Sequence, residues 1–128
     1  MKPEMKPVTA PEAPAALGPY SAGMVFGDLL FLSGQTPIDP ATGALVPGDI
    51  RAQTAQCARN LGAVLKAAGS GFDRVLKTTC FLTDMADFAA FNEVYAEYFI
   101  SKPARSTVAV RALPKGAQVE IELIAHKD

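Results

Sequence analysis

The chain has few of the residues on which many enzymes depend. It contains one histidine, His126, next to the C-terminus. This excludes a multi-histidine metal site or a histidine-based catalytic triad within one chain. It contains two cysteines, Cys57 and Cys80, whose spacing fits no zinc or redox motif. Both lie in apolar-patterned segments, so we expect small buried hydrophobic residues and no metal site.

Long apolar runs and an excess of either charge are also absent. No run approaches the ~20 residues needed to cross a bilayer. Twelve Lys and Arg residues against thirteen Asp and Glu residues give a formal charge of −1, which argues against a dedicated nucleic-acid-binding protein. The N-terminal stretch lacks the apolar region of a secretory signal. We therefore expect no membrane or nucleic-acid partner, and a location in the cytosol.

The length and composition predict one globular domain preceded by an arm. The 128 residues are 49% hydrophobic and 20% charged, which suffices for a single core and is too short for two ordinary domains. Residues 1–16 are rich in proline and alanine, which predicts an extended arm, either disordered or laid along a surface. Order is expected to begin near Gly18, and residues 17–128 are expected to form the domain.

Hydrophobic periodicity predicts two helices and five strands. Apolar residues recur every three or four positions in the helical segments, with Asp49 and Asp84 at N-cap positions and Gly69 after the first helix. The predicted order is strands 24–26 and 29–32, a loop over 36–48, helix 50–68, strand 75–82, helix 85–99, and strands 106–110 and 118–125. The pattern β-β-α-β-α-β-β, with hairpins at both ends, indicates a two-layer α+β fold.

Side-chain alternation predicts which face of the sheet each residue occupies. In the last strand the apolar positions, from Val119 to Ala125, should pack on the helices, and Glu120 and Glu122 should point away. The same reasoning places Arg105, Lys77, Thr79 and Thr107 beside these glutamates, and Leu76, Cys80, Leu82, Val108 and Val110 toward the helices. The outer face is then either solvated or packed against other subunits.

Arg105 and Glu120 are the candidate reactive side chains of the predicted outer face. Pro103 stiffens the chain before Arg105, whose guanidinium can bind a carboxylate through two hydrogen bonds. The alternative is a surface salt bridge. Glu120 is a candidate acid or base if partly buried, or else one member of an ion pair. Tyr20 and Asn92 are polar donors near element ends, and each by itself favours a structural role.

Several short motifs, in fixed order, carry a resemblance to a known family. They are Gly18-Pro19-Tyr20-Ser21, Ser33-Gly34-Gln35-Thr36-Pro37, Ala67-Ala68-Gly69, Asn92-Glu93-Val94-Tyr95, Pro103-Ala104-Arg105-Ser106, Leu113-Pro114-Lys115 and Val119-Glu120-Ile121-Glu122. Over roughly residues 16–125 the chain resembles the Rid family of YjgF-type reactive-intermediate deaminases. The resemblance implies a chorismate-mutase-like fold assembled as a homotrimer, with sites in clefts between neighbouring subunits.

The resemblance also implies an activity, which is hydrolysis of 2-enamine and 2-imino acids to 2-oxo acids and ammonia. Such compounds, including 2-aminoacrylate, 2-iminopropanoate and 2-iminobutanoate, are by-products of pyridoxal-phosphate enzymes. No metal or organic cofactor is implied. Two alternatives stay open: a non-catalytic trimer that binds a small carboxylate and has a regulatory role, and a translation-inhibiting ribonuclease or chaperone-like protein.

The family assigns a role to each matching position. Arg105 would bind the substrate carboxylate, and Glu120 would position water and relay a proton. Tyr20 and Ser33 would line the pocket, Asn92 would contribute to its wall, and Gly34 would allow close approach of the backbone. Ser106 and Thr107 would offer backbone groups beside the imine carbon. Many relatives carry a cysteine where this chain has Thr107, so thiol chemistry at that position is excluded here.

Overall fold

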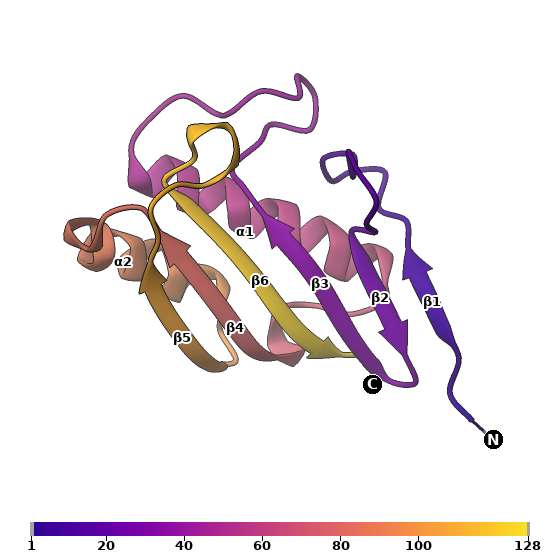
Figure 1. Ribbon diagram of the computed structural model, residues 1–128. Helices are drawn as coiled ribbons and strands as arrows, with labels where there is room; N and C mark the ends of the chain where they lie inside the picture. The colour runs from indigo at the N-terminus through magenta and orange to yellow at the C-terminus, as the bar shows by residue number, and fades with distance from the viewer. Residues whose placement is uncertain (1, 128) are drawn as a thin grey trace.

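The computed structural model describes residues 2–127, which form six strands and two α-helices. The strands are β1 (Met5–Val8), β2 (Gly23–Phe26), β3 (Leu29–Gln35), β4 (Val75–Leu82), β5 (Ala104–Ala109) and β6 (Val119–His126), and the helices are α1 (Ile50–Ala67) and α2 (Phe88–Tyr98). Short 3₁₀ turns occupy Phe72–Arg74, Met85–Asp87 and Pro114–Gly116. The strands form one mixed sheet in the order β1-β2-β3-β6-β4-β5, and both helices cover the same face (Figure 1). The predicted two-layer α+β fold is confirmed.

The N-terminal arm contributes a strand that the sequence analysis did not expect. β1 pairs antiparallel with β2, so Met5 lies opposite Phe26. Val8 and Ala13 are buried in the core. The expectation that order begins near Gly18 is therefore wrong. Pro7 is compatible with β1 because this strand lies at the sheet edge, where a missing N–H breaks no ladder bond.

The predicted hairpin at the C-terminal end is also wrong. β5 pairs in parallel with β4, and β6 lies between β3 and β4, antiparallel to both. The chain therefore leaves the sheet edge after β5 and returns to its centre as β6. The predicted hairpin at the other end is confirmed, because Gly27 adopts a φ of +63° in a two-residue turn between β2 and β3.

Both helices begin near capping aspartates. The Asp49 carboxylate accepts hydrogen bonds from the backbone N–H groups of Arg51 and Ala52, at 3.1 and 3.2 Å, which satisfies free donors at the start of α1. Gly69 follows the helix with a φ of +80°. Asp84 caps the 3₁₀ turn that precedes α2 rather than the helix itself, so the second helix begins three residues later than predicted.

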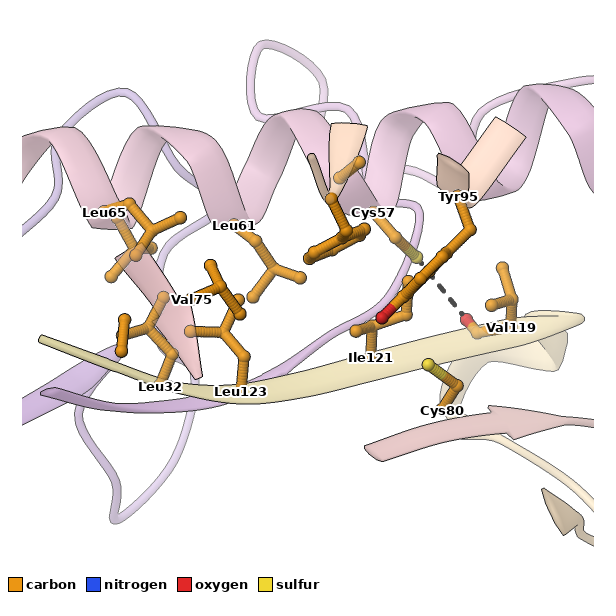
Figure 2. Packing of buried hydrophobic residues seen from close by; sticks show 14 of the residues in the cluster. Leu32, Cys57, Leu61, Leu65, Val75, Cys80, Tyr95, Val119, Ile121 and Leu123 are labelled. Atoms are coloured by element: carbon orange, nitrogen blue, oxygen red, sulfur yellow. Dashed lines mark hydrogen bonds between the residues drawn. The ribbon is translucent and has the colours of Figure 1, made fainter. Parts of the chain in front are cut away.

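The core lies between α1 and the central strands, as Figure 2 shows for the labelled residues. Leu61 and Leu65 pack toward Ile121 and Leu123 of β6. The predicted alternation of β6 is confirmed, since its apolar positions are buried and its glutamates are not. In β4, Leu76 is exposed rather than facing the helices, because a bulge interrupts the register with β6 at this end of the strand.

Both cysteines are buried and unpaired, as the sequence predicts. The Cys57 thiol donates to the Val119 carbonyl at 3.6 Å. Burial is the main reason that the pKa of Cys57 lies well above its usual value and that the pKa of Cys80 is raised to about 11. Both side chains are therefore neutral thiols near pH 7.

Candidate functional site

Arg105 lies on the helix-covered side of edge strand β5, half-buried beside α2. Its Nη1 donates to Asn92 Oδ1 at 2.7 Å. The predicted placement of Arg105 and Thr107 on the outer face is wrong. That prediction followed the alternation of β6, but β5 pairs with β4, where Arg105 lies opposite buried Thr78 and Thr107 opposite buried Cys80.

Aromatic side chains of α2 form a platform for the guanidinium. The Arg105 Cζ lies 4.8 Å from the centre of the Tyr95 ring, 5.5 Å from that of Phe88 and 6.0 Å from that of Phe91. These distances are typical of cation–π contacts. The Tyr95 hydroxyl is bonded in turn to Thr78 Oγ1 at 2.7 Å, which fixes the platform to the sheet.

The charge of Arg105 is not neutralised by the protein over residues 2–127, where none of the four ion pairs involves it. The salt bridge weighed as the alternative role for Arg105 is therefore not formed within these residues. A cavity of about 590 Å³ opens beside Arg105, with Asn92, Tyr95 and Lys102 in its walls. This arrangement fits an anionic ligand with one apolar side.

Glu120 occupies the face of the sheet that the helices do not cover, which we call the open face, and it packs against Gly34. The register of β3 with β6 shifts between Leu32 and Gln35, which brings the backbone at Gly34 onto the Glu120 side chain. A Cβ at position 34 would lie 2.9 Å from Glu120 Cδ and closer still to its Oε2, so any other residue here requires the glutamate side chain to shift. The close neighbour of this backbone position is thus a protein side chain, and the predicted approach of a substrate to Gly34 stays a prediction.

The environment of Glu120 favours its neutral form. The pKa of Glu120 is raised first by desolvation, because the side chain is about half buried, and second by the negative charge of Glu122. No ion pair involves Glu120 among residues 2–127, so the ion-pair alternative is not met there. A carboxyl group with a raised pKa suits proton transfer near neutral pH.

Tyr20 and Gly34 share one cavity of about 420 Å³, at the end of the sheet where β3 leaves it. Ser33 lies on the other side of Tyr20 and lines, with it, a second cavity of about 300 Å³. The Ser33 hydroxyl donates to the Ser21 carbonyl at 2.6 Å, which holds the segment that carries Tyr20 against β3. Tyr20 itself is 54% exposed, so its phenol is available to a ligand.

Ser106 and Thr107 follow Arg105 on β5 and differ in exposure. Ser106 is exposed on the outer face. Thr107 Oγ1 is buried and has no hydrogen-bond partner within residues 2–127. This hydroxyl lies on the same face as the guanidinium but is closed off inside the protomer, where Thr107 is opposite Cys80.

One protomer does not bring all the predicted residues together. Arg105, Asn92 and Thr107 lie at the β5 edge on the helix side of the sheet. Glu120 and Gly34 lie on the open side, with β6 and β4 between β3 and β5. The predicted residues therefore form two groups, one at each of these places.

Sequence reasoning gave no role to three polar residues that lie in the buried stripe of α1, namely Gln53, Gln56 and Asn60. Gln53 Oε1 accepts from the backbone N–H of Gln118, just before β6, at 2.8 Å. Asn60 Nδ2 donates to the carbonyls of Thr36 and Ile38, at 3.1 and 2.9 Å. A helix whose apolar stripe includes amides at fixed spacing is the signal that could have found them.

Neither a metal cluster nor a membrane helix is present in the part of the chain that the structure describes. No group of three or more His, Cys, Asp or Glu side chains within residues 2–127 is arranged to hold a metal ion. No helix in this range is long and apolar enough to span a membrane.

The six-stranded mixed sheet with two helices on one face is an α+β fold that matches the YjgF, chorismate-mutase-like structures. It carries an unneutralised arginine at its edge and a half-buried glutamate on its open face. The family model described as "Endoribonuclease L-PSP" matches residues 10–127. The chain belongs to this family, the Rid/YjgF family.

Curated relatives and solved structures agree with this assignment over nearly the whole chain. A RutC family protein of Pyrococcus horikoshii is 54% identical, covering 91% of this chain and 93% of the relative. The 2-iminobutanoate/2-iminopropanoate deaminase of Mus musculus is 48% identical, covering 94% and 90%. The crystal structure of yeast YEO7 is 47% identical with a TM-score of 0.94, covering 98% and 100%. That of E. coli TdcF with bound serine is 40% identical with a TM-score of 0.91, covering 96% and 99%.

Proposed function

We propose that this protein hydrolyses 2-imino acids, and the enamines from which they form, to 2-oxo acids and ammonia. The observation that carries the proposal is the Arg105 guanidinium, held by Asn92 and the aromatic platform and left without a carboxylate partner within residues 2–127. A relative that is 48% identical is named a 2-iminobutanoate/2-iminopropanoate deaminase. A solved relative binds serine, which carries a carboxylate next to a nitrogen-bearing carbon as an imino acid does.

The chemistry is an addition of water followed by loss of ammonia. Arg105 binds the carboxylate of the substrate and so fixes the C=N carbon in place. Glu120, as the carboxylate, accepts a proton from water while the water oxygen bonds to that carbon. Glu120 passes this proton to the nitrogen, which gives a carbinolamine. The hydroxyl proton of the carbinolamine then moves to the nitrogen through Glu120 while the C–N bond breaks and the C=O bond forms, so that ammonia leaves a 2-oxo acid. The balance is one imino acid plus one water to one oxo acid plus one ammonia, and no cofactor takes part.

The other site residues have supporting roles in this scheme. Tyr20 and Ser33 line the pocket, Gly34 lets the backbone approach Glu120, and Asn92 holds the guanidinium. Ser106 and Thr107 present backbone groups beside the reacting carbon. The substrates would be the reactive by-products of pyridoxal-phosphate enzymes, met in the cytosol.

We further propose that the site is completed in a homotrimer, in a cleft between neighbouring subunits. The two groups of residues lie on opposite faces of one protomer, so a second copy must bring a guanidinium to a glutamate. The open face of the sheet carries exposed apolar side chains that suit such an assembly, among them Phe26, Leu29, Phe31 and Val108, each 40–46% exposed.

The test is turnover of enzymatically generated 2-aminoacrylate by Arg105 variants, with release of pyruvate and ammonia as the measurement. Arg105→Ala is expected to lower kcat/KM by about 100-fold or more, because the substrate is no longer oriented. Arg105→Lys is also expected to fail, since a point charge does not reproduce a two-pronged contact. Arg59→Ala, on the exposed surface of α1, is the matched control. Unchanged rates of pyruvate and ammonia release in Arg105→Ala would rule out the proposed mechanism.

The same variants separate this function from its alternatives. A non-catalytic carboxylate-binding trimer would bind 2-oxobutanoate through Arg105 in calorimetry but would not accelerate imine hydrolysis. The family description names an endoribonuclease, and RNA cleavage that survives stringent purification and is unaffected by Arg105→Ala would favour that reading.

A further inference from the structure

The cavity that touches Tyr20 and Gly34 extends well beyond them. It measures about 420 Å³, within the range of ~300–1,000 Å³ that is usual for small-molecule sites. Its outer part lies between the N-terminal arm and loop 36–48, which rises past the end of the sheet (Figure 1). The reaction scheme gives no role to this outer part.

The outer walls of the cavity are apolar. One wall is the arm, with Pro14, Ala15, Ala16 and Leu17, and the facing wall carries Ile38 and Pro40. Leu17 is 77% exposed, which leaves a large apolar side chain uncovered by the rest of the protomer. The charged residue of the lining is Lys115, and its Nζ already donates to the Gly43 carbonyl at 2.9 Å. The walls therefore suit an apolar group.

Hydrogen bonds hold the wall opposite the arm, which carries Ile38 and Pro40, in place. Asn60, which is 2% exposed, donates from Nδ2 to the carbonyls of both Thr36 and Ile38. The Val46 N–H donates to the Pro37 carbonyl at 2.9 Å, which closes the loop on itself. A cavity whose walls are already held needs little ordering when a ligand enters, and this favours affinity.

We propose that this cavity receives the substrate's side chain, so that the protein prefers 2-imino acids with branched apolar side chains, and that Leu17 determines this preference. The inference rests on the proposed function. Gly34 joins the two parts of the site, because Glu120 packs against it from the open face and it also lines the cavity. With the reacting carbon beside Glu120, the side chain of the substrate extends from there between Leu17 and Ile38.

Two substrates of different length test the preference. An L-amino acid oxidase generates 2-imino-4-methylpentanoate from leucine and 2-iminopropanoate from alanine, and acceleration of ammonia release is measured with each. The protein is expected to have at least a tenfold higher kcat/KM for the branched compound, because each methylene buried in an apolar pocket contributes several-fold. Equal values, or a preference for the short compound, would overturn the proposal.

Variants of the arm test the role of Leu17. Leu17→Ala is expected to lower kcat/KM about tenfold for the branched substrate and less than about threefold for the short one. Ala16→Leu fills the cavity from the same wall and should reduce use of the branched substrate again. Both positions are exposed, so neither variant endangers the fold. Met85→Ala, an exposed apolar residue outside the cavity, is the matched control and should leave the ratio unchanged. An unchanged ratio in Leu17→Ala would overturn the role of Leu17.

Binding distinguishes failure of this inference from failure of the proposed function. Calorimetry with 4-methyl-2-oxopentanoate and pyruvate reports side-chain preference without any turnover. Tighter binding of the branched oxo acid that is lost in Leu17→Ala would support the cavity even if no imine were hydrolysed. Hydrolysis of both imines without a difference in binding would leave the proposed function intact and remove the inference.

Discussion

Glu120 packs so closely against Gly34 that a Cβ at position 34 would overlap the glutamate's carboxylate. Gly34→Ala is therefore expected to push this carboxylate aside while leaving the sheet intact. We expect a loss of turnover of about 10²–10⁴-fold, the contribution usual for a positioned acid or base. Steady-state kinetics measures the loss, and circular dichroism checks the fold.

Gly69→Ala is the control for this substitution. Gly69, unlike Gly34, has open space around its Cβ position, and it follows α1 with a φ of +80°. Its replacement strains the backbone without touching Glu120, and its turnover should stay within a few-fold of the parent. Equal loss in both variants would show that Gly34→Ala acts through general backbone strain rather than through Glu120.

Asn92 and Arg105 give a second prediction. Asn92→Ala removes one hydrogen bond to the guanidinium and should raise KM modestly. Asn92→Asp keeps the shape but places a carboxylate 2.7 Å from the guanidinium, where it competes with the substrate. We expect a larger rise in KM for Asn92→Asp than for Asn92→Ala. The rise for Asn92→Asp should be about tenfold or more, because hydrogen bonds to charged groups are stronger than those between neutral groups. The reverse order would contradict an anion-binding role for Arg105.

Glu122 contributes to the pH dependence of the reaction. Its charge is one cause of the raised pKa of Glu120, after desolvation. If ionised Glu120 is the base, activity rises with pH through that pKa, and Glu122→Gln should move the acidic limb of the kcat/KM profile to lower pH. Glu97→Gln, an exposed residue of α2, removes the same charge elsewhere and should not move it.

The raised pKa of Glu120 also predicts a pH-dependent stability. Because the folded pKa lies above the usual value of 4.5, its favourable contribution is present below that value and is lost as pH rises through the folded pKa. Glu120→Gln should therefore be more stable than the parent at pH 7 and equal to it near pH 4. Thermal unfolding at both pH values measures this, and greater parent stability at pH 7 would contradict it.

A charged substitution on the open face of the sheet is expected to disrupt the proposed trimer. Phe31 is 42% exposed at the centre of this face, opposite Ile124 of β6. Phe31→Asp places a charge there and should convert a trimer to monomers in sedimentation velocity, with turnover lost at the same time. Phe31→Leu keeps the surface apolar and should retain both. A monomeric parent protein with full activity would contradict the proposed inter-subunit site.

The sequence predicted best where a residue pattern acts locally. Asp49 caps α1, Gly27 turns the first hairpin, and the alternation of β6 separates buried Ile121 from Glu120, because each of these depends on neighbours close in the chain. The family motifs also identified Gly34 and Arg105 as positions of interest before their surroundings were known.

Long-range pairing was decided only by the tertiary structure. The face on which Arg105 lies depends on β5 pairing with β4 rather than with β6, and no pattern within residues 104–109 specifies its partner. The strand at Met5–Val8 likewise exists because β2 offers it an edge. The sequence by itself determined the elements that follow the arm, their order and the reactive residue types. The tertiary structure decided which faces those residues share, since strand pairing depends on contacts between distant segments that local periodicity does not encode.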